Sequence, residues 1–409
     1  MGPLDSIRIV DMTSVLMGPS ATQMLGDMGA EVIKVEAPDG DLMRQVVPYR
    51  TEGMGALFMN ANRSKRSICL DLKKASGKAA LFELIKDADI LVYNVRPQAM
   101  ERLGLGYEAV AACNPRLIYA GVYGFGQSGP YAAKPAYDDL IQGASGMSAL
   151  IQRSGGGIPR YVPTAIADRV VGLAAVGAIC ASIVARDRTG LGQRVDVPMF
   201  ETMVQFVLAD HLAGLSYDPP LDRGGYPRQL SPERRPYQTS DGYVCALVYN
   251  DKHWKNFLSA IGMVDLPDRD PRFATFAART ANIDYVYGEL ARWFLSRTTA
   301  EWLDLLERAD VPAMPMHDLE SLLVDPHLEQ VGFFQPVDHP TEGRMRSMRL
   351  PMTWSGTPTR IDRLPPVKGE HGREVLLEAG LSKDAVESML ADGSLILPET
   401  SAASADRRN

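Results

Sequence analysis

Short apolar segments alternate with helix-like segments over the first 125 residues. The apolar segments are residues 7–12, 31–36, 89–94 and 116–125. Stretches with the periodicity of helices lie between them, at residues 19–29 and 76–85. Strands connected by helices form parallel pairs with right-handed crossovers. The pattern therefore predicts a doubly wound, Rossmann-like α/β domain, with a ligand crevice at the carboxyl ends of its strands.

The rest of the chain predicts a second, smaller α+β domain and a return to the first. Residues 169–187 are apolar nearly all round, which is typical of a helix buried in a large domain or at a subunit interface. Thr298 and Glu301 have the spacing of a capping box. The expected divisions are a large domain at 1–215, a linker at 216–242, a small domain at 243–325, a return linker at 326–370, a C-terminal part of the large domain at 371–400, and a disordered tail at 401–409.

Composition excludes some classes of partner. The 409 residues carry a net charge of −7, which gives no electrostatic reason to expect nucleic acid or an anionic membrane as a partner. No uninterrupted run of 18 apolar residues occurs, and the N-terminus lacks the pattern of a signal peptide. We expect a cytoplasmic protein.

Cysteine and histidine positions narrow the chemistry. Cys69, Cys113, Cys180 and Cys245 lie far apart without metal-site spacing, so we expect buried, reduced thiols and no bound metal. All six histidines lie at or beyond His211. Chemistry seated in the first 210 residues must therefore proceed without a histidine base or ligand.

The glycine loop at residues 123–130 invites two interpretations that its context argues against. Gly124, Gly126 and Gly129 match a dinucleotide fingerprint, but that motif must follow the first strand and open a helix. Here the loop follows a late strand and continues into Pro130. Ser128 lacks the glycine frame of a hydrolase nucleophile.

Six blocks in order along the chain resemble the class III CoA-transferases and the related α-methylacyl-CoA racemase. The blocks are residues 17–44, 62–74, 93–108, 114–138, 164–201 and 369–382. The resemblance implies an interlocked homodimer, with CoA moved from an acyl-CoA donor to a free carboxylic acid through an aspartyl anhydride and an aspartyl-CoA thioester. CoA would be a substrate, with no tightly bound cofactor. A racemase or a non-catalytic CoA-binding protein remain alternatives.

The resemblance places the family's nucleophile on Asp168. This residue lies just ahead of the apolar helix, where the helix dipole and free N–H groups favour an anion. An ordinary helix-capping aspartate is the alternative. A carboxylate is ionised at neutral pH without a partner base, which agrees with the missing histidines.

The residues Tyr137 and Asp138 separate the two related activities. Racemases of the superfamily have a histidine followed by an acid here, whereas transferases have tyrosine and an acid. A tyrosine is a poor base for an α-proton, so a transferase is favoured, although Tyr137 can also be an ordinary half-buried aromatic. The lysine that commonly precedes the tyrosine is displaced, because Pro135 stands there and Lys134 lies one position earlier.

The resemblance also implies a CoA-binding set, whose phosphates require fixed cations. Its members are Val15, Gly18, Leu70, Lys73, Asn94, Arg96, Arg102, Gly124, Gly126, Lys134, Tyr137 and Asp138. Lys73 and Arg102 are expected at phosphates, and Val15, Leu70 and Asn94 along the nucleotide and pantetheine path. The usual arginine for stacking on adenine is replaced by Ala37.

Two further glycine loops, at residues 154–157 and 223–226, are candidate oxyanion donors or plain connectors. His253 and Trp254 are expected to pack in the small domain rather than to act in catalysis. The donor and acceptor acids are not identified by the sequence.

Overall fold

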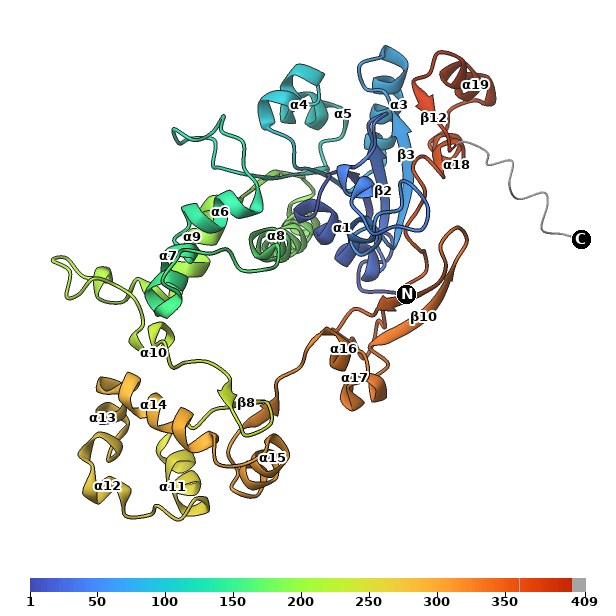
Figure 1. The fold of residues 1–409 in the computed structure, drawn as a ribbon. Coiled ribbons are helices and arrows are strands. Elements are labelled where there is room, and N and C mark those ends of the chain that lie inside the picture. Colours follow the sequence, from blue (N-terminus) through green and yellow to red (C-terminus); the bar gives the residue numbers. More distant parts are fainter. Residues whose placement is uncertain (360, 399–409) are drawn as a thin grey trace, which may run out of the picture. The chain divides into compact units, whose positions relative to one another are not determined.

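The computed structural model describes residues 1–359 and 361–398, which divide into two compact units (Figure 1). The first unit contains Met1–Ser145, Val162–Val204 and the chain from Val331 onward. The second contains Gly146–Tyr161 and Gln205–Gln330. The expected tail at 401–409 lies outside the described residues.

The first unit is built on a sheet of seven strands in the order β12-β3-β2-β1-β4-β5-β6. The strands are β1 (Arg8–Met12), β2 (Glu31–Glu36), β3 (Lys65–Leu70), β4 (Ile90–Tyr93), β5 (Ile118–Tyr123), β6 (Arg194–Pro198) and β12 (Leu395–Ile396). All neighbouring pairs are parallel except β12 with β3. The order 3-2-1-4-5-6 is that of a doubly wound sheet, which confirms the expected α/β class of the large domain.

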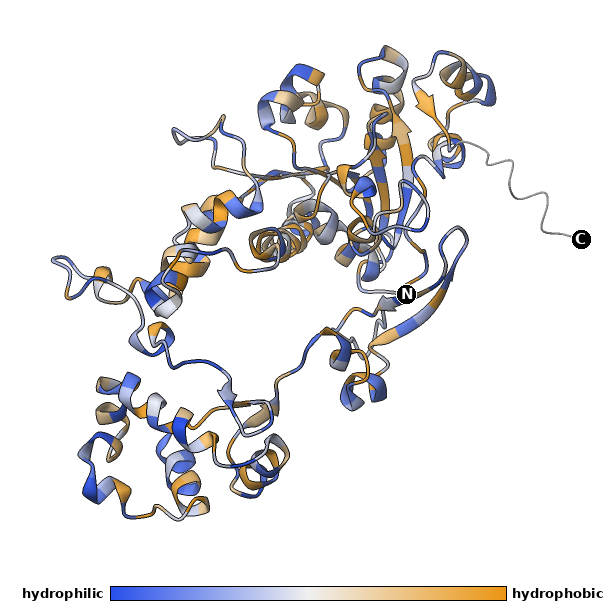
Figure 2. Ribbon diagram, in the orientation of Figure 1, coloured by the Kyte–Doolittle hydropathy of each residue, from blue (hydrophilic) through white to orange (hydrophobic). Residues whose placement is uncertain are grey.

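Helices cover both faces of the sheet (Figure 1). On one face α1 (Met17–Asp27) packs along α8 (Ile166–Thr189), and a side chain at Gly172 would come within 2.9 Å of the Met17 carbonyl oxygen. On the other face, one apolar cluster joins the strands to α3 (Ala75–Lys86), α4 (Pro97–Leu103), α5 (Tyr107–Cys113), α18 (Gly372–Glu378) and α19 (Lys383–Ala391). Strands β1, β2, β3, β4 and β5 are buried along nearly their whole length, and the sheet includes orange, hydrophobic segments in Figure 2, as expected for strands covered on both faces.

Helix α8 is not buried all round, as one face remains open in the single chain. Leu173 is 57% exposed and Val184 is 50% exposed. By length and composition this helix is the one in the described chain that would be able to cross a membrane, a property that core helices share. Both ends are fixed to the sheet unit, because Arg169 donates to Ser20 and Arg186 pairs with Asp89 at 2.7 Å.

The second unit combines helices with a three-stranded antiparallel sheet, β7 (Tyr237–Gln238), β8 (Tyr243–Ala246) and β9 (Ala313–Pro315). Its own aromatic core contains Trp254, Phe257, Phe294 and Trp302. The helices α11 (Asp251–Ala260), α14 (Ile283–Phe294) and α15 (Thr299–Arg308) surround that core. The capping box of Thr298 and Glu301 is present at the start of α15.

The expected linkers contain regular structure. Within 216–242, α10 (Pro227–Leu230) forms and β7 pairs with β8, because the Tyr237 ring stacks on Phe294 in the core. Within 326–370 the chain forms α17 (Pro326–Gln330) and a hairpin, β10 (Phe334–His339) with β11 (Gly343–Met348). Both segments thus contain helices and paired strands in addition to connecting chain.

Candidate active site

The order of the strands reverses between β1 and β4, so their carboxyl ends define the crevice in which doubly wound sheets bind ligands. The loop that follows β1 and Asn94, which follows β4, meet there. Asn94 accepts a hydrogen bond from the Ser14 N–H at 3.0 Å through Oδ1, and donates to the Ser14 carbonyl at 2.7 Å through Nδ2. The side chain of Asn94 thus fixes the loop rather than pointing freely at a ligand.

Val15 in this loop has a strained backbone. Its φ of +70° lies in the left-handed region, which costs a β-branched residue on the order of 1–3 kcal/mol. The conformation is held by Asp41, which accepts from the Val15 N–H at 3.1 Å and from Lys34 Nζ at 2.9 Å. Lys34 also donates to the Thr13 carbonyl at 2.8 Å. A buried ion pair therefore shapes the backbone at the proposed CoA site.

Asp11 and Lys65 form a second buried ion pair, in addition to that of Lys34 and Asp41. Asp11 and Lys65 are both fully buried, with Asp11 Oδ2 and Lys65 Nζ 3.0 Å apart. Burial alone would raise the pKa of Asp11, but Lys65, Lys34 and the hydroxyls of Thr13 and Thr22 lower that pKa to about 2. Burial lowers the pKa of Lys65 to about 8, against the attraction of Asp11. Both members of the pair stay charged at neutral pH.

Asp168 occupies a different environment, in the first turn of α8. The helix begins at Ile166 with Ala165 as its N-cap, so Asp168 is the third helical residue, neither ahead of the helix as expected nor the capping aspartate of the alternative. Its backbone N–H donates to Asp138 Oδ1 at 3.0 Å. Its half-buried carboxylate forms no hydrogen bond or ion pair with any residue that the structure describes.

The pKa of Asp168 is raised to about 7, first by burial and then by the charge of Asp138, while Arg169 opposes the shift. Arg169 does not contact the carboxylate directly, because its guanidinium donates to Ser20 Oγ at 2.6 Å. The expectation of a carboxylate fully ionised at neutral pH is therefore wrong for the free chain. A group with a pKa of about 7 is roughly half protonated at pH 7.

Asp138 and Gln142 position the chain that leads into α8. Both belong to α6 (Asp138–Ala144), and Gln142 Nε2 donates to Asp138 Oδ2 at 2.6 Å. Gln142 also accepts from the Val162 N–H at 2.8 Å and donates to the Thr164 carbonyl. Because Asp138 binds the Asp168 N–H, α6 holds the start of α8 through three contacts.

The loop after β1 reaches the start of α8. Val15 and Ala165 both pack on one apolar cluster, which includes Leu16 and Phe58. Asp168 lies one helical turn beyond Ala165. The structure thus brings the Val15 loop and the candidate nucleophile to the same end of the sheet.

Tyr137 and Lys134 lie at the surface of the first unit. Tyr137 precedes α6 and is 64% exposed, so the alternative of a half-buried packing residue does not hold. The Lys134 ammonium lies 4.0 Å from the centroid of the Tyr131 ring, a cation–π contact. Both side chains are open to a ligand or to another chain.

The candidate phosphate ligands are exposed cations near the strand ends. Lys73 follows β3, Arg102 lies in the last turn of α4, and Arg96 precedes α4. Arg96 donates to the Ala133 carbonyl at 3.1 Å. The side chain of Leu70, by contrast, is fully buried in the core and presents no surface to a ligand.

The three site glycines allow close packing of backbone. A Cβ at Gly18 would come within 2.4 Å of Thr13, and one at Gly124 within 2.3 Å of the Ala136 Cβ. The Gly126 N–H donates to Glu201 Oε1 at 2.9 Å. In this chain these glycines therefore allow close backbone packing, and the Gly126 amide is already occupied.

Several residues that shape the site gave no separate signal in the sequence. Lys34 and Asp41 lie under the Val15 loop, Gln142 supports α8, and Glu201 holds the glycine loop. An aspartate one residue after Gly40 is an ordinary turn pattern, so its burial depends on contacts distant in the sequence. At the position beside Ala37, Glu36 pairs with Arg44 at 2.6 Å, which lowers the pKa of Glu36 to about 2 despite burial.

The remaining candidates from the sequence are two glycine loops, His253 and the four cysteines. The loops 154–157 and 223–226 both belong to the second unit, as does His253, whose backbone N–H is capped by Asn250. The four cysteines are free. Cys69 is buried, which raises the pKa of its thiol to about 11, but Cys245 is exposed, so the expectation that all four are buried is wrong.

The fold and site agree with a known family of CoA enzymes. The profile of CoA-transferase family III matches residues 4–372. The chain belongs to this family, and it is a CoA-transferase.

Relatives and solved structures extend the comparison over most of the chain. A succinate–glutarate CoA-transferase of Agrobacterium fabrum is 34% identical over 392 residues, covering 92% of this chain and 95% of its own. A formyl-CoA:oxalate CoA-transferase of Escherichia coli is 30% identical, covering 95% and 98%. The crystal structure of a CAIB/BAIF family protein from Brucella suis superposes with a TM-score of 0.77 at 32% identity, covering 92% and 99%.

Proposed function

We propose that this protein transfers CoA from an acyl-CoA to a free carboxylic acid through covalent intermediates on Asp168. The observation that carries the proposal is the state of that carboxylate. It is half-buried at the first turn of α8, has no counterion or hydrogen-bond donor among the described residues, and has a pKa near 7. Attack requires the ionised form, which the N-terminal dipole of α8 favours.

The reaction proceeds in four exchanges at carbonyl carbon. The Asp168 carboxylate attacks the thioester carbonyl, the C–S bond breaks, and CoA thiolate leaves with its electron pair, giving an anhydride. The thiolate attacks the aspartyl carbonyl of the anhydride, forming an enzyme–CoA thioester and releasing the donor acid. The acceptor carboxylate then expels the thiolate, forming a second anhydride. Attack of the thiolate on the acceptor's carbonyl gives the new acyl-CoA and restores Asp168.

The surrounding residues suit this sequence of steps. The Val15 loop and the open cations Lys73 and Arg102 provide a path and charges for CoA at the strand ends. Tyr137, exposed beside Asp138, is available to donate a hydrogen bond to substrate. The relatives' names as CoA-transferases acting on organic acids support the same class of donor and acceptor.

The proposal extends to a cytoplasmic homodimer of interlocked protomers. The open apolar residues of α8, among them Leu173 and Val184, support a second chain as their cover. Light scattering at several concentrations would measure the assembly, and a monomer throughout would contradict it.

The direct test is to trap the covalent intermediate on Asp168. We expect the wild-type protein, incubated with an acyl-CoA, to yield a CoA-loaded or hydroxylamine-modified peptide that contains Asp168 in mass spectrometry. The isosteric change Asp168→Asn should lower transfer by roughly 10³-fold or more, because it removes the nucleophile, while CoA binding persists. Asp187→Asn, an exposed aspartate at the far end of α8, is the matched control.

Two results would contradict the mechanism. Transfer by Asp168→Asn at the wild-type rate would remove Asp168 from the chemistry. Exchange of the α-hydrogen of a 2-methylacyl-CoA in deuterated water, without any labelled Asp168 peptide, would indicate a racemase instead.

A further inference from the structure

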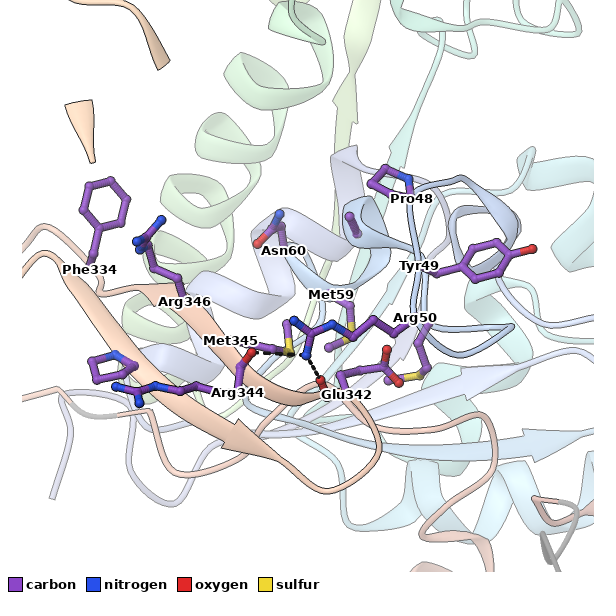
Figure 3. Close-up of a pocket in the computed structure, with 13 residues that line it drawn as sticks. Pro48, Tyr49, Arg50, Met59, Asn60, Phe334, Glu342, Arg344, Met345 and Arg346 are labelled. Carbon is purple, nitrogen blue, oxygen red and sulfur yellow. Dashed lines mark hydrogen bonds between the residues drawn. The ribbon is translucent and has the colours of Figure 1, made fainter. Parts of the chain in front are cut away.

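A cavity of about 770 Å³ lies in the first unit, between residues 48–60 and the hairpin of β10 and β11 (Figure 3). Its volume falls within the range of roughly 300–1,000 Å³ that is common for small-molecule sites. The hairpin is anchored over the loop by Arg50, which donates to the Glu342 and Arg344 carbonyls along the dashed lines of Figure 3. None of the residues assigned above to CoA binding or catalysis lines this cavity.

The lining carries an excess of positive charge in a protein of negative net charge. Three arginines, Arg50, Arg344 and Arg346, line the cavity together with one carboxylate, that of Glu342. Glu342 is 5% exposed, and its carboxylate accepts from the Thr51 N–H at 3.1 Å and from the Thr341 hydroxyl at 2.9 Å. The carboxylate of Glu342, the one acid in the lining, thus accepts hydrogen bonds from the loop and from the hairpin turn.

Two of the guanidinium groups are free to bind an anion. Arg344 and Arg346 are two residues apart on β11, so their side chains leave the same face of the hairpin. In the described chain neither guanidinium forms a hydrogen bond or an ion pair. Arg346 instead lies 5.9 Å from the centroid of the Phe334 ring. A planar guanidinium matches a carboxylate with two parallel hydrogen bonds.

Most of the rest of the lining is apolar, with Tyr49 and Asn60 adding polar groups. Met54, Met59 and Phe334 are among its apolar residues. Methionine is unbranched and flexible, so such a surface accommodates apolar chains of differing shape. The lining therefore fits a molecule with an anionic head and an apolar body.

We propose that this cavity binds an organic carboxylate with an apolar chain, whose carboxylate lies between Arg344 and Arg346. The site is separate from Asp168 and does not depend on the proposed transfer. It is connected to the catalytic end through α2 (Ala56–Met59), because Ala56 and Met59 line the cavity while Phe58 packs in the cluster that holds Val15 and Ala165. A bound acid therefore contacts the helix that supports the active-site loop.

The test is calorimetric titration of the full-length protein with octanoate, in the absence of CoA, with octan-1-ol as the uncharged match. We expect octanoate to bind at least about tenfold more tightly than octanol, since charged hydrogen bonds of this kind contribute about 1.5–3 kcal/mol. The double change Arg344→Gln with Arg346→Gln should weaken octanoate about tenfold or more. Arg188→Gln, at an exposed arginine beyond the cavity, should leave it unchanged.

Three results would overturn the proposal. They are equal binding of octanol and octanoate, unaltered binding by the double variant, and loss of octanoate binding in Asp168→Asn, which would place the acid at the catalytic carboxylate. A double variant with Arg344→Lys and Arg346→Lys keeps the charge but not the planar fork, and should show an intermediate loss. Thermal melting of each variant separates a binding defect from misfolding.

Discussion

Asp11 and Asp168 are two carboxylates of the same unit with opposite properties. Asp11 is completely buried, yet its pKa falls to about 2, because two lysines and two hydroxyls surround it. Asp168 is less buried, yet burial and then the charge of Asp138 raise its pKa to about 7, because no donor or cation among the described residues contacts its oxygens to offset them. For these two carboxylates the neighbouring groups, more than the depth of burial, determine whether the ionised form is stabilised or destabilised when it is removed from water.

The comparison separates structural from reactive charge. In the Asp11–Lys65 and Lys34–Asp41 ion pairs the opposite charges neutralise each other. These pairs fix the strand ends and the loop at Val15. Asp168 keeps its charge uncompensated, which suits a group that must form and break bonds with substrate.

The largest effect on the structural side is expected from Asp11→Asn. The change leaves Lys65 buried without its counterion, which typically destabilises a protein by about 3–5 kcal/mol. Urea unfolding of the variant and of Asp5→Asn, an exposed aspartate of the same unit, would measure it. A loss below about 1 kcal/mol would mean that the pair is not the support that we infer.

An intermediate effect is expected from Asp138→Asn on the reactive side. The pKa of Asp168 is raised, so its acid form predominates below about pH 7 and kcat/KM should fall as pH drops through that value. Removal of the Asp138 charge lowers the Asp168 pKa, so the fall should occur at a lower pH. The pH profile of kcat/KM is the measurement.

Asp139→Asn, at the next position of the same helix, serves as the control for that pH profile, since Asp139 does not contribute to the Asp168 shift. An unmoved midpoint in Asp138→Asn would show that burial alone sets the pKa of Asp168.

The smallest effect is expected from Val15→Gly. Glycine relieves the left-handed strain but adds freedom to the unfolded chain, so we expect a net gain of up to about 1 kcal/mol in unfolding free energy. Val46→Gly, in the same cluster with a φ of −79°, should lose stability instead. If both variants lose stability equally, the Val15 backbone is not strained.

Most of the sheet is predictable from the sequence, and β3 and β12 are the exceptions. β1, β2, β4 and β5 lie within continuous apolar segments, as expected for strands buried on both faces. The sequence pattern does not predict β3 as a strand, because β3 begins with Lys65 and Arg66, whose buried charges are compensated by residues distant in the sequence, Asp11 among them.

The site was predictable only in part. The resemblance to the family singled out Asp168, but its place in the helix and its raised pKa depend on Ala165 and Asp138, whose positions follow from tertiary packing. The assignments to CoA binding stay predictions, and Leu70 is the one whose side chain is entirely enclosed. The cavity beneath the hairpin has no counterpart in the sequence pattern, since the hairpin lies within the expected return linker at 326–370.

The pairing of β12 with β3 has a consequence for biosynthesis. Leu395 aligns with Leu70, and α18 and α19 complete the apolar cluster on that side of the sheet. A ribosome makes β3 more than 300 residues before β12, since Leu70 and Leu395 are that far apart in the sequence. During that interval β3 is an unpaired edge that favours association with other chains. We therefore expect the open edge of β3 to remain available for such association until β12 has been synthesised.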